Sequence, residues 1–202
     1  MKVIEVEQLT KCYGPIRALD SFSFTLNHNR ILGLLGQNGA GKTTLIKTIL
    51  RLVDFKQGKI LVNGMDQKTG ESRQKIAYLP EKFSFFPYYT VKSCLEFYAQ
   101  MREMQKEEQI SAINKAMKRL DILSLENRKV KTLSKGQLQR LGLATLLLGK
   151  DLSIYILDEP FSGLDPLGIK DLKELIFDLK NQGKTIMLSS HILAETETIC
   201  EE

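Results

Sequence analysis

Alternating apolar and polar positions open the chain and predict β-strands. Residues 3 to 9 alternate apolar with mainly charged side chains, and residues 22 to 27 repeat the alternation with Phe, Phe and Leu. A period of two is typical of strands that bury one face, which suits an antiparallel sheet exposed on its other face. A further strand is predicted over residues 59–62, before the turn Asn63-Gly64. We therefore expect a small antiparallel β subdomain.

After residue 80 the pattern changes to the period of a helix. Two segments place apolar side chains on one helical face: Val91, Cys94, Leu95, Tyr98 and Met101 in the first, and Ile110, Ile113, Met117 and Leu120 in the second. We expect a mainly helical subdomain over residues 83–148, inserted within one folded unit because no low-complexity linker or internal repeat borders it. Its cluster Phe85-Phe86-Pro87-Tyr88-Tyr89 is either part of a core or a docking surface for a partner.

Two continuous apolar runs later in the chain predict buried parallel strands. Residues 153–157 end at Asp158-Glu159, and residues 185–188 end at Ser189-Ser190-His191. An amphipathic helix over residues 169–179, which ends near Gly183, would connect them as the crossover of an α/β core. Because ligands bind at the carboxyl ends of strands in such sheets, and because buried carboxylates are costly, both polar strand ends are candidate functional groups.

A glycine-rich stretch lies between an apolar strand, residues 31–35, and a helix predicted over residues 42–52. Its sequence is Gly36-Gln37-Asn38-Gly39-Ala40-Gly41-Lys42-Thr43-Thr44. The spacing matches the phosphate-binding loop, in which backbone N–H groups and the following helix N-terminus bind a nucleoside triphosphate. We expect Lys42 to contact the β- and γ-phosphates and the Thr43 hydroxyl to be a ligand of Mg²⁺. A glycine-rich turn that matches by chance is the alternative.

Length and composition limit the class of protein. The chain has 202 residues, 43% of them hydrophobic and 26% charged, as in ordinary globular proteins. No apolar run approaches the roughly 18 residues of a membrane-spanning helix, and the N-terminus lacks the apolar core of a signal peptide. We therefore expect a cytoplasmic protein. The three cysteines, Cys12, Cys94 and Cys200, are scattered and predict neither a disulfide framework nor a metal site.

The net charge of +5 comes from one segment. Residues 101–140 hold ten Lys or Arg and five Asp or Glu, so their excess equals that of the whole chain. A solvated helix face is the default explanation for such charge. Proximity to an anionic membrane surface or to an acidic partner is the sharper alternative.

Further motifs follow the phosphate loop. They are Leu133-Ser134-Lys135-Gly136-Gln137, Asp158-Glu159-Pro160, Ser162-Gly163-Leu164-Asp165 and His191. With these motifs in this order, from Tyr13 to His191, the chain resembles the ATP-binding cassette (ABC) ATPase family, and in particular cassettes of the ABC-2 exporter type. The resemblance implies an α/β fold, with a P-loop NTPase core and parallel sheet, a small antiparallel β subdomain and an inserted mainly helical subdomain. Within one domain, residues 1–82 and 149–202 would form the core and β subdomain, and residues 83–148 the helical subdomain.

The resemblance also implies roles at the nucleotide. Tyr13 would stack on adenine, a contact worth about 1–3 kcal/mol. Asp158 would hold Mg²⁺, mainly through water. Glu159 would be the general base that polarises the attacking water, and His191 the switch residue that contacts the γ-phosphate. Phosphoryl transfer agrees with such a set, since it needs positioning and charge neutralisation more than covalent chemistry.

A second set of residues implies a dimer. Ser134, Lys135, Gly136 and Gln137 resemble the signature loop, which in this family binds the γ-phosphate of ATP held by another subunit. A head-to-tail homodimer or heterodimer of two ABC ATPases, closed by two ATP molecules, is therefore implied. Asp165 lies in the loop that would join the two sites.

Three features depart from the commonest family pattern. Lys135 replaces a glycine, and Glu81 stands where the family often has glutamine. Glu81 could still offer an oxygen to Mg²⁺ or to its water, whereas either side chain turned to solvent is the alternative. The family chain usually continues after the switch histidine, but this sequence ends at Cys200-Glu201-Glu202. We expect a C-terminus shortened relative to the family, in either a truncated form or a naturally short gene.

These observations predict an ATP-hydrolysing subunit of an ABC transporter that uses ATP and Mg²⁺ and drives a separate transmembrane permease, with export as the expected direction. It would lie on the inner face of the cell membrane through that permease, and no nucleic acid is expected as a partner. The first alternative is an ABC ATPase that acts in translation or DNA repair. The others are a GTPase or small-molecule kinase, which would leave the signature loop without a purpose, and a cassette that binds ATP but turns over poorly.

Overall fold

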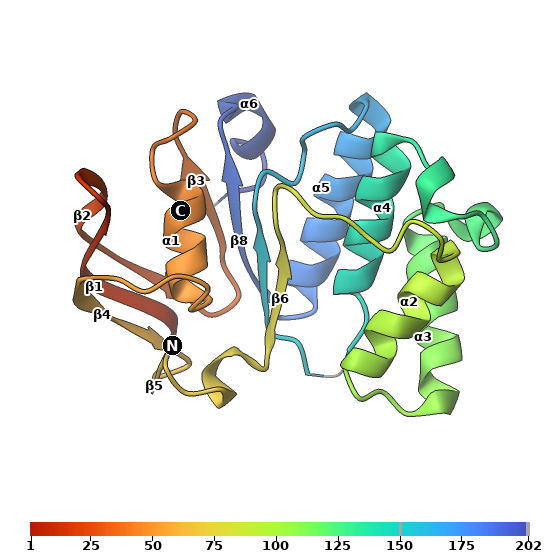
Figure 1. Cartoon of the computed structure of the whole chain (residues 1–202), viewed down its shortest axis with the longest axis horizontal. Helices are drawn as coiled ribbons and strands as arrows, with labels where there is room; N and C mark the ends of the chain where they lie inside the picture. The colour runs from red at the N-terminus through yellow and green to blue at the C-terminus, as the bar shows by residue number, and fades with distance from the viewer. Residues whose placement is uncertain (150, 201–202) are drawn as a thin grey trace. The chain divides into compact units, whose positions relative to one another are not determined.

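The computed structural model describes residues 1–149 and 151–200 (Figure 1). These residues divide into two units. The first unit comprises Met1–Ala77, Leu152–Glu159 and the described residues from Leu175 onward, and the second comprises Tyr78–Asp151 and Pro160–Glu174. The subdomain boundaries predicted after residues 82 and 148 stay a prediction. Glu201 and Glu202, at the end that we expect to be shortened, lie outside the described residues.

The first unit contains most of the strands. Its elements are β1 (Lys2–Tyr13), β2 (Ile16–Asn27), β3 (Ile31–Leu35), α1 (Lys42–Ile49), β4 (Gln57–Val62), β5 (Met65–Asp66), a 3₁₀ turn (Glu71–Arg73), β7 (Ile154–Leu157), β8 (Thr185–Ser190) and α6 (Leu193–Thr196). The second unit contains α2 (Val91–Met101), α3 (Lys106–Arg119), two 3₁₀ turns (Leu123–Leu125 and Val130–Thr132) and α4 (Lys135–Leu146). Two elements have residues in both units: β6 (Ile76–Leu79) and α5 (Pro166–Asn181).

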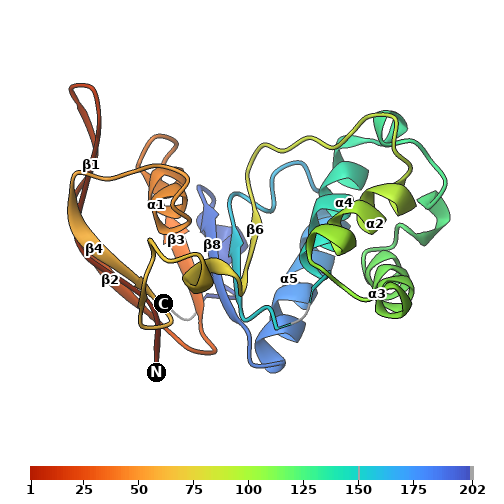
Figure 2. The same cartoon turned by 60° about the horizontal axis from the view of Figure 1, so that its bottom comes forward.

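The predicted antiparallel sheet is present in the first unit, with the strand order β2-β1-β4-β5 (Figure 2). Val6 of β1 pairs with Phe24 of β2 and with Ile60 of β4, and the side chains of Val6 and Ile60 are buried. The predicted turn between β4 and β5 has φ of 52° at Asn63 and 76° at Gly64. Positive φ at both central residues is the requirement of a type I′ hairpin, which Asn-Gly meets at low cost.

Gly58, at the start of β4, provides a test of this sheet. Its φ is +111°, and a Cβ there would lie 2.7 Å from the Glu7 carbonyl oxygen and 2.7 Å from Leu9 Cα. We expect Gly58→Ala to lower the free energy of unfolding by about 1–3 kcal/mol more than Gly64→Ala does. Gly64 is the matched control, because its φ is also positive but a Cβ would meet no described atom within 4 Å. Urea unfolding measures both, and equal losses would show that crowding at Gly58 is unimportant.

The parallel sheet has the order β3-β8-β7-β6, so β8 lies between β3 and β7. β7 and β8 are buried along their whole length, which explains their continuous apolar runs. β8 is two residues longer than predicted, since Ser189 and Ser190 are also in the strand and fully buried. α1 lies beside β3 (Figures 1 and 2). It ends at Ile49 rather than at residue 52, because Arg51 takes a left-handed backbone conformation with φ of 55°.

In the second unit the helical prediction is confirmed, and most apolar positions of α2 and α3 are buried. Tyr98 is half-buried, and Met101 and Ile110 are exposed, with 65% and 64% of their surface accessible. Met101 is the last residue of α2, and Ile110 lines an open groove of about 390 Å³ between α2 and α3. The apolar stripe is therefore narrower than the sequence pattern indicates.

The aromatic cluster of residues 85–89 is divided between core and surface. Phe85 is half-buried and packs edge-on against Tyr98 of α2, with ring centroids 5.8 Å apart. Phe86 and Tyr88 are 54% and 72% exposed. Lys131 lies over the Tyr88 ring, 5.1 Å from its centroid. The core interpretation thus holds for Phe85, whereas a docking role for the exposed rings stays a prediction.

Two cysteines are packing residues with unreactive thiols. Burial raises the pKa of the Cys94 thiol to about 12 and that of the Cys200 thiol to about 11. Both thiols are therefore protonated at neutral pH, and the thiolate is the nucleophilic form. Separately, none of the helices in the described parts of the chain is long and apolar enough to cross a membrane.

Candidate nucleotide and catalytic site

Three chain segments of the first unit meet at one edge of the parallel sheet. β3 leads into the glycine loop, β7 leads into Asp158 and Glu159, and β8 leads into His191. In the parallel register, Leu35 of β3 pairs with Ser190 of β8, and Leu157 of β7 pairs with Leu188. The carboxyl ends of all three strands therefore lie together, which is where open α/β sheets bind ligands.

The glycine loop has the backbone that its sequence predicts. Gly39 and Gly41 have φ of 86° and 93°, and a Cβ on Gly41 would lie 2.6 Å from the Ala18 carbonyl oxygen. Lys42 is the first residue of α1, and its ammonium donates hydrogen bonds to the carbonyl oxygens of Gly36 (2.6 Å) and Gln37 (3.2 Å). The Lys42 side chain thus folds back over the loop. This arrangement places a cation and a helix N-terminus at one concave backbone, a site for an anion.

Glu159 contacts both of the other predicted catalytic residues. Its Oε2 lies 2.8 Å from His191 Nδ1, and its Oε1 lies 3.3 Å from Lys42 Nζ. Because an ionised carboxylate only accepts hydrogen bonds, Nδ1 of His191 is the donor, which leaves Nε2 for another partner. The side chains of Lys42 and Glu159 are only 9% and 10% exposed, so water screens their ion pair weakly. The structure therefore brings Lys42, Glu159 and His191 together.

The backbone of Glu159 is unusual. Its φ is 50°, in the left-handed region, which costs a residue other than glycine about 1–2 kcal/mol. The Glu159 N–H donates a 2.8 Å hydrogen bond to the hydroxyl of Ser189 on β8. Strained backbone that the surrounding structure holds in place is typical of functional sites.

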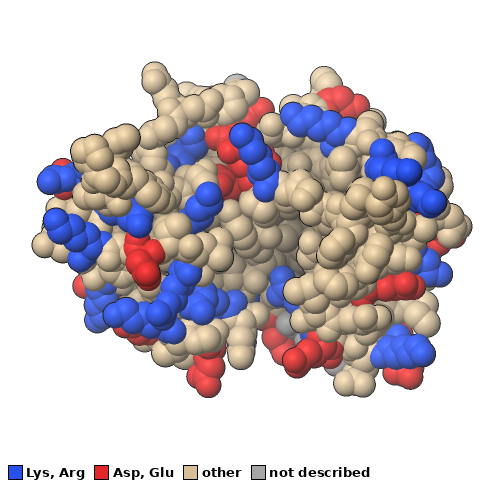
Figure 3. All heavy atoms as spheres, viewed as in Figure 1, with Lys and Arg blue, Asp and Glu red and all other residues tan. Residues whose placement is uncertain are grey.

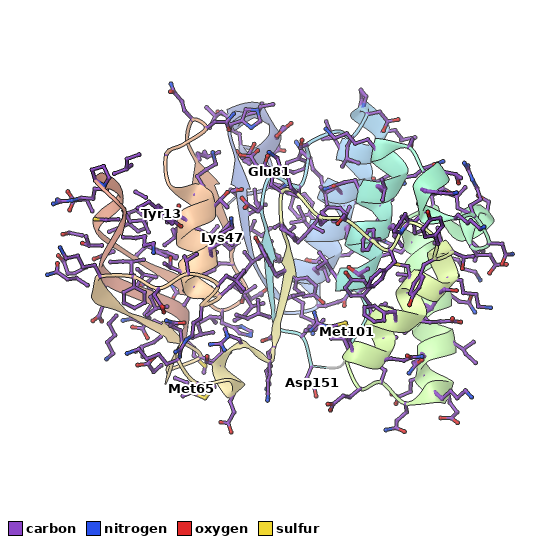
Figure 4. The ribbon with its side chains drawn as sticks, in the orientation of Figure 1. Tyr13, Lys47, Met65, Glu81, Met101 and Asp151 are labelled. Atoms are coloured by element: carbon purple, nitrogen blue, oxygen red, sulfur yellow. The ribbon has the colours of Figure 1, made fainter. Side chains whose placement is uncertain are left out.

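Asp158 has the features of a cation ligand. Only 1% of its surface is exposed, and its Oδ1 accepts a 2.7 Å hydrogen bond from the Ser189 hydroxyl. Its Oδ2 is buried and has no hydrogen-bond partner among the described residues. A buried carboxylate oxygen without a partner is costly, and oxygen is the ligand type that Mg²⁺ prefers. Asp158 and the Thr43 hydroxyl, in the same unit, therefore fit a Mg²⁺ site. Glu81, the third predicted ligand, is exposed after β6 in the second unit, and its role stays a prediction (Figure 4).

Tyr13 ends β1 with 45% of its surface exposed (Figure 4). The ammonium of Lys11 lies over the ring, 4.7 Å from its centroid, so a cation covers one face of the ring. The opposite face is the one on which a base could stack. The ring is therefore accessible, and its role in binding adenine stays a prediction.

The predicted signature loop begins α4 in the second unit. The Ser134 hydroxyl accepts a hydrogen bond from Gln137 N–H (3.2 Å), and the Gln137 side chain accepts one from Ser134 N–H (3.0 Å). This is a capping box, which holds the N-terminus of α4 in a fixed shape. The remaining N–H groups of the first turn and the helix dipole make this terminus attractive to an anion.

Lys135 packs against the loop that holds Asp165. A Cβ added to Gly163 would lie 2.5 Å from Lys135 Cε and 2.8 Å from its Cδ, so the lysine stem crosses the Gly163 backbone. Asp165 itself accepts a 2.8 Å hydrogen bond from Gly168 N–H at the start of α5. The Lys135 side chain is exposed to solvent, as the alternative predicts, while its stem packs across the Gly163 backbone.

Two polar residues near the motifs have contacts that the sequence did not predict. Gln139 is 8% exposed, and its side-chain amide donates a 2.8 Å hydrogen bond to the Pro160 carbonyl oxygen, which links the signature helix to the segment after Glu159. Ser189 bridges Asp158 and Glu159. For Gln139, a polar residue on an apolar helix face is the sequence signal for such a contact. For Ser189, the only signal is a serine at the end of a strand.

Comparisons with known proteins identify the family to which this chain is similar. A family model described as "ABC transporter" matches residues 19–162. The uncharacterized ABC transporter ATP-binding protein YhaQ of Bacillus subtilis is 37% identical over 199 residues, which cover 98% of this chain and 66% of YhaQ. The lipopolysaccharide export system ATP-binding protein LptB of Haemophilus influenzae is 32% identical, over 100% of this chain and 85% of LptB. A solved structure of an ATP binding subunit of an ABC transporter aligns with a TM-score of 0.88 and 31% identity, over 98% of this chain and 83% of that one.

Proposed function

The chain belongs to the ABC transporter ATP-binding family and carries the ATPase domain of that family, and we propose that it drives a separate membrane permease by binding and hydrolysing ATP. The observation that carries the catalytic part is the contact of Glu159 with both Lys42 and His191 at the edge where the glycine loop begins. The chain spans just under two thirds of YhaQ, at 66% of its length, so the transport activity of the whole protein belongs to the proposal.

Each residue of this edge has a task in phosphoryl transfer. The glycine loop from Gly36 to Thr44 would bind the phosphates through its N–H groups, and Lys42 would contact the γ-phosphate. Thr43 and Asp158 would supply oxygen ligands for Mg²⁺, whose charge offsets that of the β- and γ-phosphates. Tyr13 would stack on the adenine.

Glu159 would accept the proton of the attacking water. Its two oxygens already contact Lys42 and His191, so the carboxylate is held from both sides. A γ-phosphate competes with Glu159 for the Lys42 ammonium, since one cation cannot neutralise both groups fully. ATP binding would therefore loosen the Lys42 contact and make Glu159 available as the base, while His191 orients the water.

A second cassette would complete the site. Ser134 and the first turn of α4, including Lys135, Gly136 and Gln137, would bind the γ-phosphate held by the partner copy. The capping box supports this proposal because it presets the shape of that helix end. The loop at Asp165 would lie between the two sites. The partner is a second copy of this chain or a related ABC ATPase.

A permease would dock on the second unit and hold the protein at the inner face of the membrane. The exposed rings of Phe86 and Tyr88 lie within the stretch from Glu81 to Tyr89, which would form the coupling surface against the permease. On the face shown in Figure 3, Lys and Arg side chains over α2 to α4 form separate groups with Asp and Glu between them. This pattern favours a solvated surface over a nucleic-acid groove. The transporter names of the relatives favour transport over a role in translation or DNA repair, and the name of LptB favours export.

Ser134→Asp tests the proposed dimer. Aspartate is as good an N-cap as serine, so α4 should keep its stability, but its charge would repel a γ-phosphate. In a Glu159→Gln background, we expect Ser134→Asp to weaken ATP-dependent dimerisation at least about tenfold, equivalent to about 1.4 kcal/mol. Size-exclusion chromatography with light scattering measures the dimer.

Ser134→Asn is the matched control, because it is a neutral N-cap of nearly the same size as aspartate. We expect it to dimerise within about threefold of the parent, a difference below about 1 kcal/mol. Urea unfolding should show equal stability for both variants. Dimerisation of Ser134→Asp as strong as that of Ser134→Asn would remove Ser134 from the phosphate site and leave the ATPase proposal to stand on the first unit.

A further inference from the structure

Ser189 occupies a special position at the end of β8. It is fully buried, and its hydroxyl lies between the two residues that follow β7. The hydroxyl donates to Asp158 Oδ1 at 2.7 Å and accepts from Glu159 N–H at 2.8 Å. A hydroxyl has one proton to donate, so its proton is committed to Asp158 and a lone pair to Glu159.

The bond to Glu159 fixes a strained turn. Glu159 leaves β7 with a left-handed φ of 50°, and this turn accompanies the contacts of its carboxylate with Lys42 and His191. Its N–H, which is part-buried, would lose this hydrogen-bond partner if the Ser189 hydroxyl were removed. An unpartnered N–H favours a different turn, and a different turn would move the carboxylate.

The bond to Asp158 selects which oxygen remains available. Ser189 occupies Oδ1, while Oδ2 has no hydrogen-bond partner in the described chain. The bond also fixes the rotation of the carboxylate about its Cβ–Cγ axis, because Oδ1 must point at Ser189. Oδ2 is consequently presented in one direction, which suits a cation that demands near-ideal octahedral geometry.

We propose that Ser189 is a positioning residue of the ATPase reaction, which through one hydroxyl orients Asp158 toward Mg²⁺ and holds Glu159 in the turn that brings its carboxylate to Lys42 and His191. The proposal rests on the function proposed above for Asp158 and Glu159. Ser189 is fully buried, and its hydroxyl is bonded to these two residues. It acts through its two neighbours, so its loss should affect the response to Mg²⁺ and the rate of hydrolysis together.

The next residue along the strand provides a matched control. Ser190 is equally buried, but its hydroxyl accepts from Ile192 N–H at 3.0 Å and lies 2.9 Å from Glu195 Oε2. Within the part of the chain that the structure describes, its hydroxyl makes no hydrogen bond with Asp158 or Glu159, since its partners Ile192 and Glu195 lie just before and within α6. Ser190→Ala therefore removes a buried hydroxyl from the same strand end without touching the carboxylate pair.

The binding experiment separates Mg²⁺ from the phosphate loop. Calorimetry with a non-hydrolysable ATP analogue gives the affinity in EDTA and in Mg²⁺. For Ser189→Ala we expect the affinity in EDTA to stay within about twofold, because the glycine loop and Lys42 are intact, and the gain from Mg²⁺ to fall about tenfold. For Ser190→Ala we expect both values to stay within about twofold of the parent.

The kinetic experiment tests the effect on Glu159. At saturating ATP, Ser189→Ala should lower kcat about 10- to 100-fold and raise the Mg²⁺ concentration for half-maximal rate about tenfold. Ser189→Thr, which keeps a hydroxyl, should recover most of both losses. A Ser189→Ala protein that behaves like Ser190→Ala in both experiments overturns the proposal, and so does a Thr variant as impaired as Ala.

Two further outcomes are a Ser189→Ala protein that does not fold and a failure of the proposed function itself. If Ser189→Ala does not fold, Ser189→Cys replaces it, because a thiol has nearly the size of a hydroxyl but donates weakly. Equal Mg²⁺ responses of the Cys and Thr variants would then overturn the proposal. If the parent protein hydrolyses ATP and Glu159→Gln does not, but Ser189→Ala is normal, only this inference fails. If the parent protein does not hydrolyse ATP, or if Glu159→Gln does not abolish its hydrolysis, the proposed function fails instead.

Discussion

Glu159→Gln is expected to slow ATP hydrolysis by about 10²- to 10⁴-fold, the usual contribution of a general base, while ATP binding persists. Glutamine has the shape of glutamate, so its side chain can remain between Lys42 and His191, which lie 3.3 Å and 2.8 Å from the carboxylate oxygens. Its amide cannot accept the proton of an attacking water. Phosphate release in a single turnover measures the chemical step directly.

The same variant should accumulate an ATP-bound dimer, because hydrolysis is the step that would reopen it. Size-exclusion chromatography with light scattering detects that dimer. Glu174→Gln is the control for the change of charge, since the Glu174 carboxylate is 55% exposed and pairs with Lys170 only at 4.0 Å. We expect Glu174→Gln to hydrolyse ATP at the parent rate. Turnover of Glu159→Gln within about threefold of the parent would assign the base to another group, because loss of a general base costs far more.

Much of the fold follows from local patterns in the sequence. The alternation over residues 3 to 9 predicts a strand that is present, because a period of two is typical of strands. The Asn63-Gly64 turn predicts a hairpin that is present, because both residues readily take a positive φ. The sequence pattern ends β8 two residues too early, because serines are typical of a strand terminus. Their burial depends on β3 and β7, which lie on either side of β8 in the sheet and far from it in the sequence. Tertiary contacts thus decide an element boundary that a local pattern cannot.

At the candidate site, too, the sequence predicts some features and not others. The glycine loop could be predicted because spacing alone fixes the path of its backbone. The left-handed φ of Glu159 could not, since glutamate has no preference for that conformation. The sequence also could not predict the proposed role of Ser189, because its partners Glu159 and Asp158 lie 30 and 31 residues away in the chain. The position of Lys135 across Gly163 depends on two loops that meet only in the folded protein. Motifs therefore predict the groups that would contact the substrate, while the groups that hold those residues in place are found only in the structure.

Lys42→Ala is expected to weaken ATP binding by about 10- to 100-fold. A charged hydrogen bond contributes about 1.5–3 kcal/mol, and the Lys42 side chain is only 9% exposed, so salt should screen its interaction with a phosphate weakly. Calorimetry with ATP in EDTA isolates this contact from Mg²⁺. Lys47→Ala is the control, because Lys47 lies in the last turn of the same helix, away from the glycine loop (Figure 4). We expect Lys47→Ala to bind ATP within about twofold of the parent, and equal affinities of the two variants would contradict the role of Lys42.

A double variant separates binding from stability at Lys42. Removal of Lys42 leaves the carboxylate of Glu159, which is 10% exposed, without its ion pair, and this should lower the free energy of unfolding by about 1–3 kcal/mol. Adding Glu159→Gln neutralises that carboxylate, so the double variant should regain much of the stability but none of the ATP affinity. Urea unfolding and calorimetry on the same samples measure the two effects. If affinity returns together with stability, Lys42 acts by keeping the site folded, whereas recovery of stability alone means that its ammonium binds the phosphates.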